Sequence, residues 1–86
     1  MKKILLFHFD SCPYCRIARR WILEAQEENP ALFEVEIEMI DERLHPAVAR
    51  RYDYWLVPTF YVDGKKVHEG VCTRNKVIEI LKQGLL

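Results

Sequence analysis

The sequence predicts an α/β fold in which helices flank a four-stranded mixed sheet, with the element order β-α-β-α-β-β-α. Two continuous apolar runs, Ile4–Phe9 and Thr59–Val62, are typical of strands that are buried on both faces. A stretch with helical periodicity follows the first run, and Asp63-Gly64 after the second run is a strong hairpin signal. The chain has 86 residues, which is room for one domain spanning residues 1–86.

A long helix is predicted over residues 13–28. Pro13 suits the first helical position, where its missing N–H costs nothing, and Asn29-Pro30 ends the helix. Apolar residues recur at spacings of three and four, so we expect them to form the inward face of this helix: Ile17, Ala18, Trp21, Ile22 and Ala25.

Residues 33–39 alternate strictly between apolar and acidic side chains, which predicts a half-buried strand. Phe33, Val35, Ile37 and Met39 would then share the buried face. A short helix is predicted over residues 46–52, again with a proline near its start.

The last third of the chain predicts a polar strand and a final helix. The strand covers residues 66–69 and follows the Asp63-Gly64 turn. Thr73 is the predicted N-cap of the helix, because its hydroxyl can accept a hydrogen bond from a backbone N–H of the first turn. The inner face of the helix carries Val77, Ile80 and Leu81.

The polarity of the strands predicts their order in the sheet. The two fully apolar strands should be central, and the two strands with polar faces should be the edges. The first two strands are joined through a helix, so they should run parallel with a right-handed crossover. The last two strands form a hairpin and should be antiparallel.

Charge balance and cysteine count exclude several classes of protein. Thirteen basic and thirteen acidic residues give zero formal charge, whereas nucleic-acid binders normally carry a basic excess. Half of the residues are hydrophobic, which argues against disorder, and no apolar run approaches the ~20 residues of a membrane helix. The first apolar run is shorter than the ~7–15 residues of a signal-peptide core, and three cysteines do not suit a secreted disulfide scaffold. We therefore expect a cytoplasmic protein.

Cys12-Pro13-Tyr14-Cys15 carries the predicted chemistry, at the point where the first strand gives way to the first helix. Cys12 falls at the helix N-cap and Cys15 one turn later, which is close enough for an unstrained disulfide bridge. Unpaired N–H groups and a partial positive charge at a helix N-terminus favour a thiolate over a thiol. Cys12 is thus the predicted attacking thiolate, and Cys15 would resolve the mixed disulfide. Arg16 and Arg19 would add positive potential.

Two other interpretations of the cysteine pair are weaker. A structural zinc site needs four ligands, but the chain has no second C-x-x-C, and its histidines, His8, His45 and His68, lack finger-like spacing. We therefore expect no metal site. An inert pair of cysteines would leave a reactive position unused.

The motif Cys12-Pro13-Tyr14-Cys15 after an apolar strand resembles the active site of dithiol glutaredoxins, and Val57-Pro58-Thr59 resembles the cis-proline loop of the thioredoxin superfamily. The resemblance implies a thioredoxin fold, a cis Val57–Pro58 bond beside Cys12, and reversible reduction of disulfides. It implies catalytic roles for Cys12, Cys15 and Pro58. Pro13, Tyr14 and Val57 would then contact the substrate, with the Val57 backbone pairing in a strand-like manner.

The second half of the chain is more similar to thioredoxins than to glutaredoxins. Phe9 stands where glutaredoxins usually carry a lysine, and Gly70 with Val71 replaces their usual Gly-Gly. Both features help to hold glutathione in that family. Thr73 and the N–H groups that open the last helix could still receive a γ-glutamyl carboxylate.

Four further residues have expected roles near the motif. Arg50 or Arg51 could take the glycyl carboxylate of glutathione, although a solvated helix face is the commoner role for each. Cys72 is expected to be a small buried filler. Trp55 is expected to be exposed near the site, where partner proteins could contact it.

The leading functional hypothesis is a monomeric glutaredoxin-like thiol–disulfide oxidoreductase that acts on protein or glutathione disulfides. Its electron donor would be glutathione or a reductase flavoprotein, and no cofactor would be tightly bound. The alternatives are a module that binds an iron–sulfur cluster between two protomers, which Pro13 is expected to disfavour, and an interaction domain gated by its redox state.

Overall fold

The computed structural model describes all of residues 1–86 and confirms the predicted element order. The strands are β1 (Ile4–His8), β2 (Ile37–Asp41), β3 (Thr59–Val62) and β4 (Lys65–Glu69). The helices are α1 (Pro13–Glu28), α2 (Pro46–Ala49) and α3 (Arg74–Gly84). A short 3-10 helix, η1 (Pro30–Glu34), is an addition to the predicted elements. None of the helices is long and apolar enough to cross a lipid bilayer.

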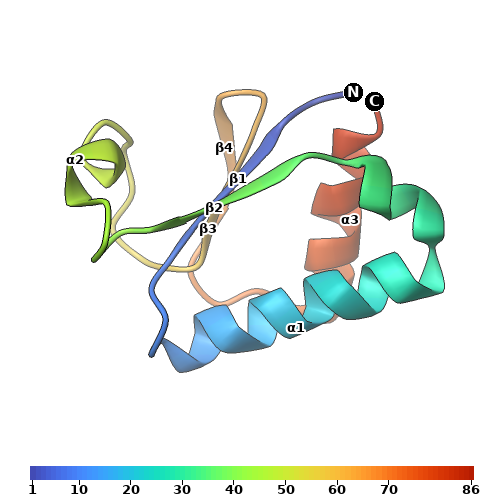
Figure 1. Ribbon diagram of the computed structural model, residues 1–86, viewed down its shortest axis with the longest axis horizontal. Helices are drawn as coiled ribbons and strands as arrows, with labels where there is room; N and C mark the ends of the chain where they lie inside the picture. The colour runs from blue at the N-terminus through green and yellow to red at the C-terminus, as the bar shows by residue number, and fades with distance from the viewer.

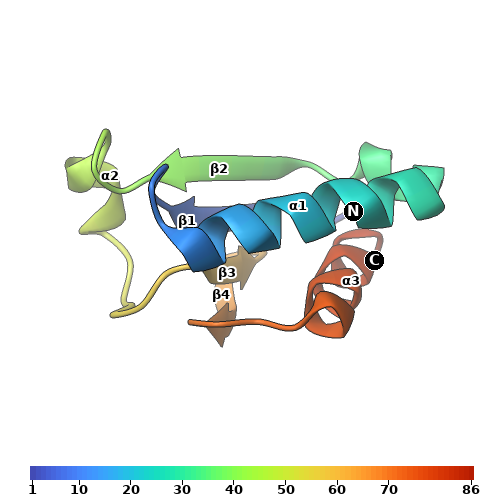
Figure 2. The same cartoon turned by 90° about the horizontal axis from the view of Figure 1, so that it is seen from below.

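The sheet has the order β2-β1-β3-β4, so the two apolar strands are central, as predicted. β1 runs parallel to β2 and antiparallel to β3, and β3 is antiparallel to β4. The hairpin between β3 and β4 turns at Asp63 and Gly64, which both have positive φ, a region that glycine adopts without steric cost. Figure 2 shows β2, β1, β3 and β4 following one another from top to bottom, with α1 crossing in front of them.

Two clusters of buried side chains hold the layers together, one on each face of the sheet. Ile4, Leu6 and Phe60 point toward α1 and α3 and belong to the larger cluster, which also contains Ile22 and Ile80. Leu5, Phe7, Ile40 and Tyr61 point the opposite way and pack with α2 and the segment after it. Figure 1 shows α1 and α3 together on one side and α2 apart from them at the other end. Successive side chains of a strand point to opposite faces of the sheet, a period of two residues, which produces this separation.

The predicted strand over residues 33–39 is wrong in its start, and its predicted buried face is confirmed at Val35 and Ile37 but not at Phe33 and Met39. Pro30 opens the 3-10 turn, which buries Leu32 and leaves Phe33 59% exposed. Pairing with β1 begins only at Ile37, so Ile40 is buried while Met39 is 42% exposed. The alternation is lost at Phe33 because this residue belongs to η1, and Met39 is exposed on the edge strand β2.

Three smaller predictions also need correction. The first strand ends at His8, one residue before the expected Phe9. The helix expected over residues 46–52 ends at Ala49, after which the chain turns back toward the sheet. On α1, Ile17 is exposed, and Trp21 lies half-buried at the margin of the larger cluster instead of in the core. The remaining inward residues of α1 and those of α3 are buried as predicted.

Candidate active site

Cys12 is the N-cap of α1, as the sequence predicts. Its backbone is extended, with φ −75° and ψ 116°, and Pro13 occupies the first helical position. The backbone N–H of Cys15 donates a hydrogen bond to Cys12 Sγ over 3.3 Å. An N-cap side chain satisfies an N–H that has no partner within the helix, and here a sulfur atom has that role. The interaction places the sulfur of Cys12 at the positive end of the helix dipole.

Cys15 lies one turn further along α1, where it is fully buried. Burial raises the pKa of the Cys15 thiol to about 12, and a hydrogen bond with Cys12 acts in the same direction. Neither cysteine is in a disulfide, and Cys12 is only 4% exposed. At neutral pH Cys15 therefore keeps its proton, as a group that acts second in an exchange reaction must.

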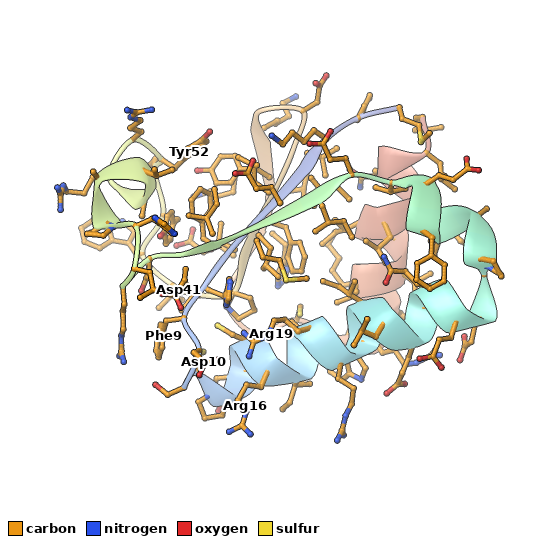
Figure 3. The ribbon with its side chains drawn as sticks, in the orientation of Figure 1. Phe9, Asp10, Arg16, Arg19, Asp41 and Tyr52 are labelled. Atoms are coloured by element: carbon orange, nitrogen blue, oxygen red, sulfur yellow. The ribbon has the colours of Figure 1, made fainter.

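Arg43 fixes the loop that connects β1 to Cys12. Its guanidinium lies over the ring of Phe9, 3.7 Å from the ring centroid, and donates to Ser11 Oγ over 3.3 Å. Asp41 accepts hydrogen bonds from the backbone N–H groups of Arg43 and Leu44, which orders the turn after β2. Figure 3 shows Phe9, Asp10 and Asp41 gathered at the start of α1.

Arg19 points from α1 toward the end of β1, whereas Arg16 leaves the opposite side of the helix toward solvent (Figure 3). The guanidinium of Arg19 is 2.9 Å from His8 Nδ1 and also approaches the carbonyl oxygen of Asp10. Burial lowers the pKa of His8, and the positive charge of Arg19 lowers it further. His8 therefore accepts the hydrogen bond from Arg19 in its neutral form.

The Val57–Pro58 peptide bond is cis, as the resemblance implies. Pro58 is buried, and its carbonyl oxygen accepts a hydrogen bond from the backbone N–H of Gly70 over 2.8 Å. β3 starts immediately after it and runs antiparallel to β1, with Thr59 opposite Phe7. The chain around Pro58 therefore lies at the end of the sheet where β1 leads into Cys12.

The remaining predicted contact residues are spread around the site. Tyr14 is 54% exposed and Val57 packs against the smaller buried cluster. Thr73 caps α3, as predicted, by accepting a hydrogen bond from the backbone N–H of Lys76 over 3.1 Å. Cys72 is buried in the larger cluster and Trp55 is 90% exposed, in agreement with both predictions.

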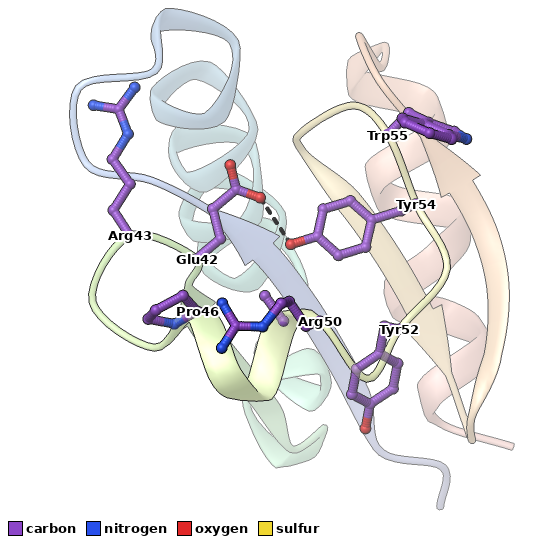
Figure 4. Close-up of a pocket in the computed structure, with 8 residues that line it drawn as sticks. Glu42, Arg43, Pro46, Arg50, Tyr52, Tyr54 and Trp55 are labelled. Atoms are coloured by element: carbon purple, nitrogen blue, oxygen red, sulfur yellow. Dashed lines mark hydrogen bonds between the residues drawn. The ribbon is translucent and has the colours of Figure 1, made fainter.

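A cavity of about 320 Å³ lies between α2 and the segment that follows it (Figure 4). Arg43 and Arg50 line it together with Tyr54 and Trp55, and the Tyr54 hydroxyl donates to Glu42 Oε1 over 2.8 Å. Of the two arginines considered for a carboxylate, Arg50 reaches this cavity, whereas Arg51 and Thr73 do not line it.

Two residues near the site have contacts that sequence reasoning missed. Arg43 contacts Ser11, which lies 32 residues earlier, and Glu69 contacts the backbone of Trp55, 14 residues earlier. No local sequence pattern predicts contacts between residues so far apart in the chain. The one available signal is that Glu69 is an acidic residue at the end of an edge strand that is otherwise basic or apolar.

Comparison with known proteins gives a consistent result. A family model described as a thioredoxin domain matches residues 2–82. A protein named thioredoxin from Methanocaldococcus jannaschii is 34% identical over 83 residues, covering 96% of this chain and 95% of that protein.

Two solved structures show the same fold. The oxidised thioredoxin from Plasmodium falciparum superposes with a TM-score of 0.73 at 16% identity and covers 95% of this chain and 79% of its own. A thioredoxin-like protein from Clostridium perfringens superposes with a TM-score of 0.65 at 26% identity, covering 96% of this chain and 70% of its own. The chain therefore belongs to the thioredoxin domain family and is a thioredoxin-type disulfide oxidoreductase with the C-x-x-C pair Cys12 and Cys15.

Proposed function

We propose that this protein reduces disulfides of other proteins, with Cys12 as the attacking group and Cys15 as the resolving group. The observation that carries the proposal is the unequal setting of the two sulfurs. Cys12 Sγ caps α1 and accepts the Cys15 N–H, whereas Cys15 is fully buried and holds its proton. The thiolate is the nucleophile in thiol–disulfide exchange, and a helix N-terminus favours that form.

The reaction proceeds in two exchanges. Cys12 Sγ attacks one sulfur of the substrate disulfide, a bond forms between them, and the other substrate sulfur leaves as a thiolate that takes up a proton. Cys15 then loses its proton and attacks Cys12 Sγ, which releases the second substrate thiol. The substrate gains two electrons and two protons, and the protein is left with a Cys12–Cys15 disulfide.

A second protein must return two electrons to that disulfide. We propose a reductase as the donor in preference to glutathione, because the residues that the resemblance implies for glutathione do not line one cavity. The hydroxyl of Thr73 is engaged in capping α3, and only one of the two candidate arginines reaches the cavity beside α2. Trp55, exposed in the segment before Pro58, suits contact with a protein partner.

Replacing each cysteine by serine tests the mechanism. Cys12→Ser should abolish reduction of insulin disulfides in the presence of dithiothreitol. Cys15→Ser should still attack but should not release its product, so a mixed disulfide with the substrate accumulates and is visible by mass spectrometry. Cys72→Ser is the control, because its buried side chain takes no part in the exchange. Full activity of the Cys12→Ser protein would exclude the mechanism.

The electron donor is tested by running the same assay with two coupled systems, glutathione with its reductase and thioredoxin reductase. Turnover with thioredoxin reductase alone supports the proposal, and turnover with glutathione alone would instead support the glutaredoxin-like hypothesis. The mechanism needs no tightly bound cofactor, so protein purified without oxygen should be colourless. Visible absorbance would favour the cluster-binding hypothesis.

A further inference from the structure

Residues 53–57 lead into cis-Pro58 and are called the docking segment below. Trp55 and Leu56 in this segment are 90% and 61% exposed, although both side chains are large and apolar. No helix or strand includes these residues, so no regular ladder of hydrogen bonds holds their backbone. The backbone conformation of the docking segment must therefore be fixed by contacts with other parts of the fold.

Glu69, the last residue of β4, supplies the main contact. One carboxylate oxygen, Oε2, accepts hydrogen bonds from the backbone N–H groups of both Trp55 and Leu56, over 2.5 and 2.9 Å. The other oxygen, Oε1, is 2.8 Å from Lys66 Nζ on the same strand. Hydrogen bonds to an ionised carboxylate are about twice as strong as neutral ones, so this contact outweighs an ordinary loop hydrogen bond.

The start of the docking segment is attached to the same hairpin. The carbonyl oxygen of Asp53 accepts hydrogen bonds from Lys66 Nζ over 3.2 Å and from the Tyr61 hydroxyl over 2.7 Å. Glu69 and Lys66 therefore act as one ion pair that holds the backbone of the segment at two points.

The side chains of the segment are disposed in two directions. Tyr54 points toward Glu42 across the cavity beside α2 and donates to it, whereas Trp55 lies at the rim of the same cavity with its indole directed outward (Figure 4). The backbone is thus attached to the protein while the indole is left to solvent. A surface that is held in its bound conformation loses less conformational entropy on association than a mobile one.

We propose that Glu69 is a positioning residue for the reduction of protein disulfides, because its carboxylate holds the Trp55–Leu56 backbone in the conformation that a protein substrate meets beside Pro58. This role rests on the proposed function, since it matters only if protein disulfides are the substrates. Small disulfides need no docking surface, so Glu69 should matter little for them.

The ionisation of Glu69 is consistent with hydrogen bonds to Trp55 and Leu56 that persist at neutral pH. The hydrogen bond from Lys66 is the largest cause that lowers the pKa of Glu69, to about 2, and the N–H groups of Trp55 and Leu56 act in the same direction. The carboxylate therefore stays ionised throughout the neutral range, and the docking segment is not released by modest acidification.

The test compares Glu69→Ala and Glu69→Gln with the unchanged protein. Insulin reduction with dithiothreitol measures the protein substrate, and stoichiometric reduction of 5,5′-dithiobis(2-nitrobenzoate) by the reduced protein measures the small one. For Glu69→Ala we expect kcat/KM with insulin to fall by about tenfold, mostly through KM, while the rate with the small disulfide changes by less than about twofold. Glu69→Gln keeps an oxygen acceptor and should recover most of the loss.

Glu38→Ala is the matched control. Glu38 is also a carboxylate on an edge strand paired to a lysine, with Lys3 Nζ at 2.7 Å, but it lies on β2 at the opposite edge of the sheet. Hydrogen exchange followed by NMR gives a readout independent of turnover. The amide protons of Trp55 and Leu56 should be protected in the unchanged protein and in Glu38→Ala, and should exchange rapidly in Glu69→Ala.

The outcomes separate the two proposals. Slow exchange at Trp55 and Leu56 in Glu69→Ala, or an unchanged KM for insulin, would overturn the positioning role alone. An equal loss with both disulfides would also overturn it, because that result indicates damage to the cysteine pair. If the unchanged protein reduces the small disulfide but not insulin, protein-disulfide reduction fails and the role of Glu69 fails with it.

Discussion

At the scale of single residues, Cys12 and Cys15 are both buried but differ in their contacts with α1. Cys12 is placed by a capping interaction at the end of α1, whereas Cys15 is enclosed by the fold. Desolvation penalises the charged form of a buried thiol, so the pKa of Cys15 rises to about 12. The different roles of the two cysteines thus follow from their positions one helical turn apart, at the N-cap and inside α1.

The raised pKa of Cys15 predicts a loss of stability in alkaline solution. In the unfolded chain its pKa is about 8.5, so the unfolded state loses this proton first as the pH rises. The contribution of the protonated Cys15 thiol to the free energy of unfolding is complete below about pH 8.5. It is lost progressively as the pH approaches 12, the folded-state pKa. Between about pH 9 and about pH 11 the free energy of unfolding should fall by up to ~1.4 kcal/mol per pH unit from this group alone.

Urea unfolding of the reduced protein measures this slope. Cys15→Ala should show a shallower decline than the unchanged protein over the same range, because the other titrating groups are common to both. Parallel declines in the two proteins would contradict the assigned surroundings of Cys15.

At the scale of elements, the charges on α1 run against its dipole. Arg16, Arg19 and Arg20 lie in its first half, and Glu24, Glu27 and Glu28 lie toward its end. Helices are more stable with acidic residues first and basic residues last. Arg74 from α3 offsets part of this cost by pairing with Glu24 and Glu28. The basic first half also puts three positive charges on the end of α1 that Cys12 caps.

Arg16→Glu should therefore move stability and reactivity in opposite directions. Arg16 is exposed on the first turns of α1, so a negative charge there should stabilise the helix by about 0.3–1 kcal/mol. The same charge should slow alkylation of Cys12 by iodoacetamide at neutral pH. Urea unfolding and the alkylation rate are the two measurements, both at low salt, where surface charges are least screened.

Added salt is the internal control for this prediction. Because Arg16 is exposed, its influence on Cys12 should shrink as the ionic strength rises. The alkylation rate of Cys12 in Arg16→Gln should lie between the rates of the unchanged protein and of Arg16→Glu. An alkylation rate in Arg16→Glu equal to that of the unchanged protein would show that the helix dipole alone governs Cys12.

At the scale of the whole molecule, α3 packs closely enough on β1 to leave no space beside Gly84. A Cβ atom added there would lie 2.4 Å from Val35 Cγ1 and 3.1 Å from Ile4 Cδ1. The carbonyl oxygen of Gly84 also accepts a hydrogen bond from the backbone N–H of Lys2, so the end of α3 is tied to the strand that leads to the active site.

Gly84→Ala should destabilise the protein although alanine is the better helix former. Alanine in a helix is favoured over glycine by about 1 kcal/mol, but overpacking of a filled core costs about 1–3 kcal/mol. Val35 is branched and buried and has little room to move. Thermal or urea unfolding should show a net loss, whereas an increase in stability would mean that α3 can shift away from β1.

Much of the fold was determined by local features of the sequence. The apolar runs of β1 and β3, the proline and asparagine that bound α1, the Asp63-Gly64 turn and the Thr73 cap each act within a few residues, so pattern alone identifies them. The Cys12–Cys15 pair is equally local, since its geometry follows from one helical turn.

Only the tertiary structure decided the start of β2, the burial of Ile40 and the attachment of the docking segment. Pairing with β1 begins at Ile37 because the 3-10 turn at Pro30 uses up the preceding residues, and strand pairing joins positions that are distant in the chain. The contacts of Arg43 with Ser11 and of Glu69 with Trp55 form only after β1, β2 and β4 take their places in one sheet. Short-range periodicity determines which elements form. Contacts between residues distant in the chain determine how the loop before Cys12 and the docking segment are held.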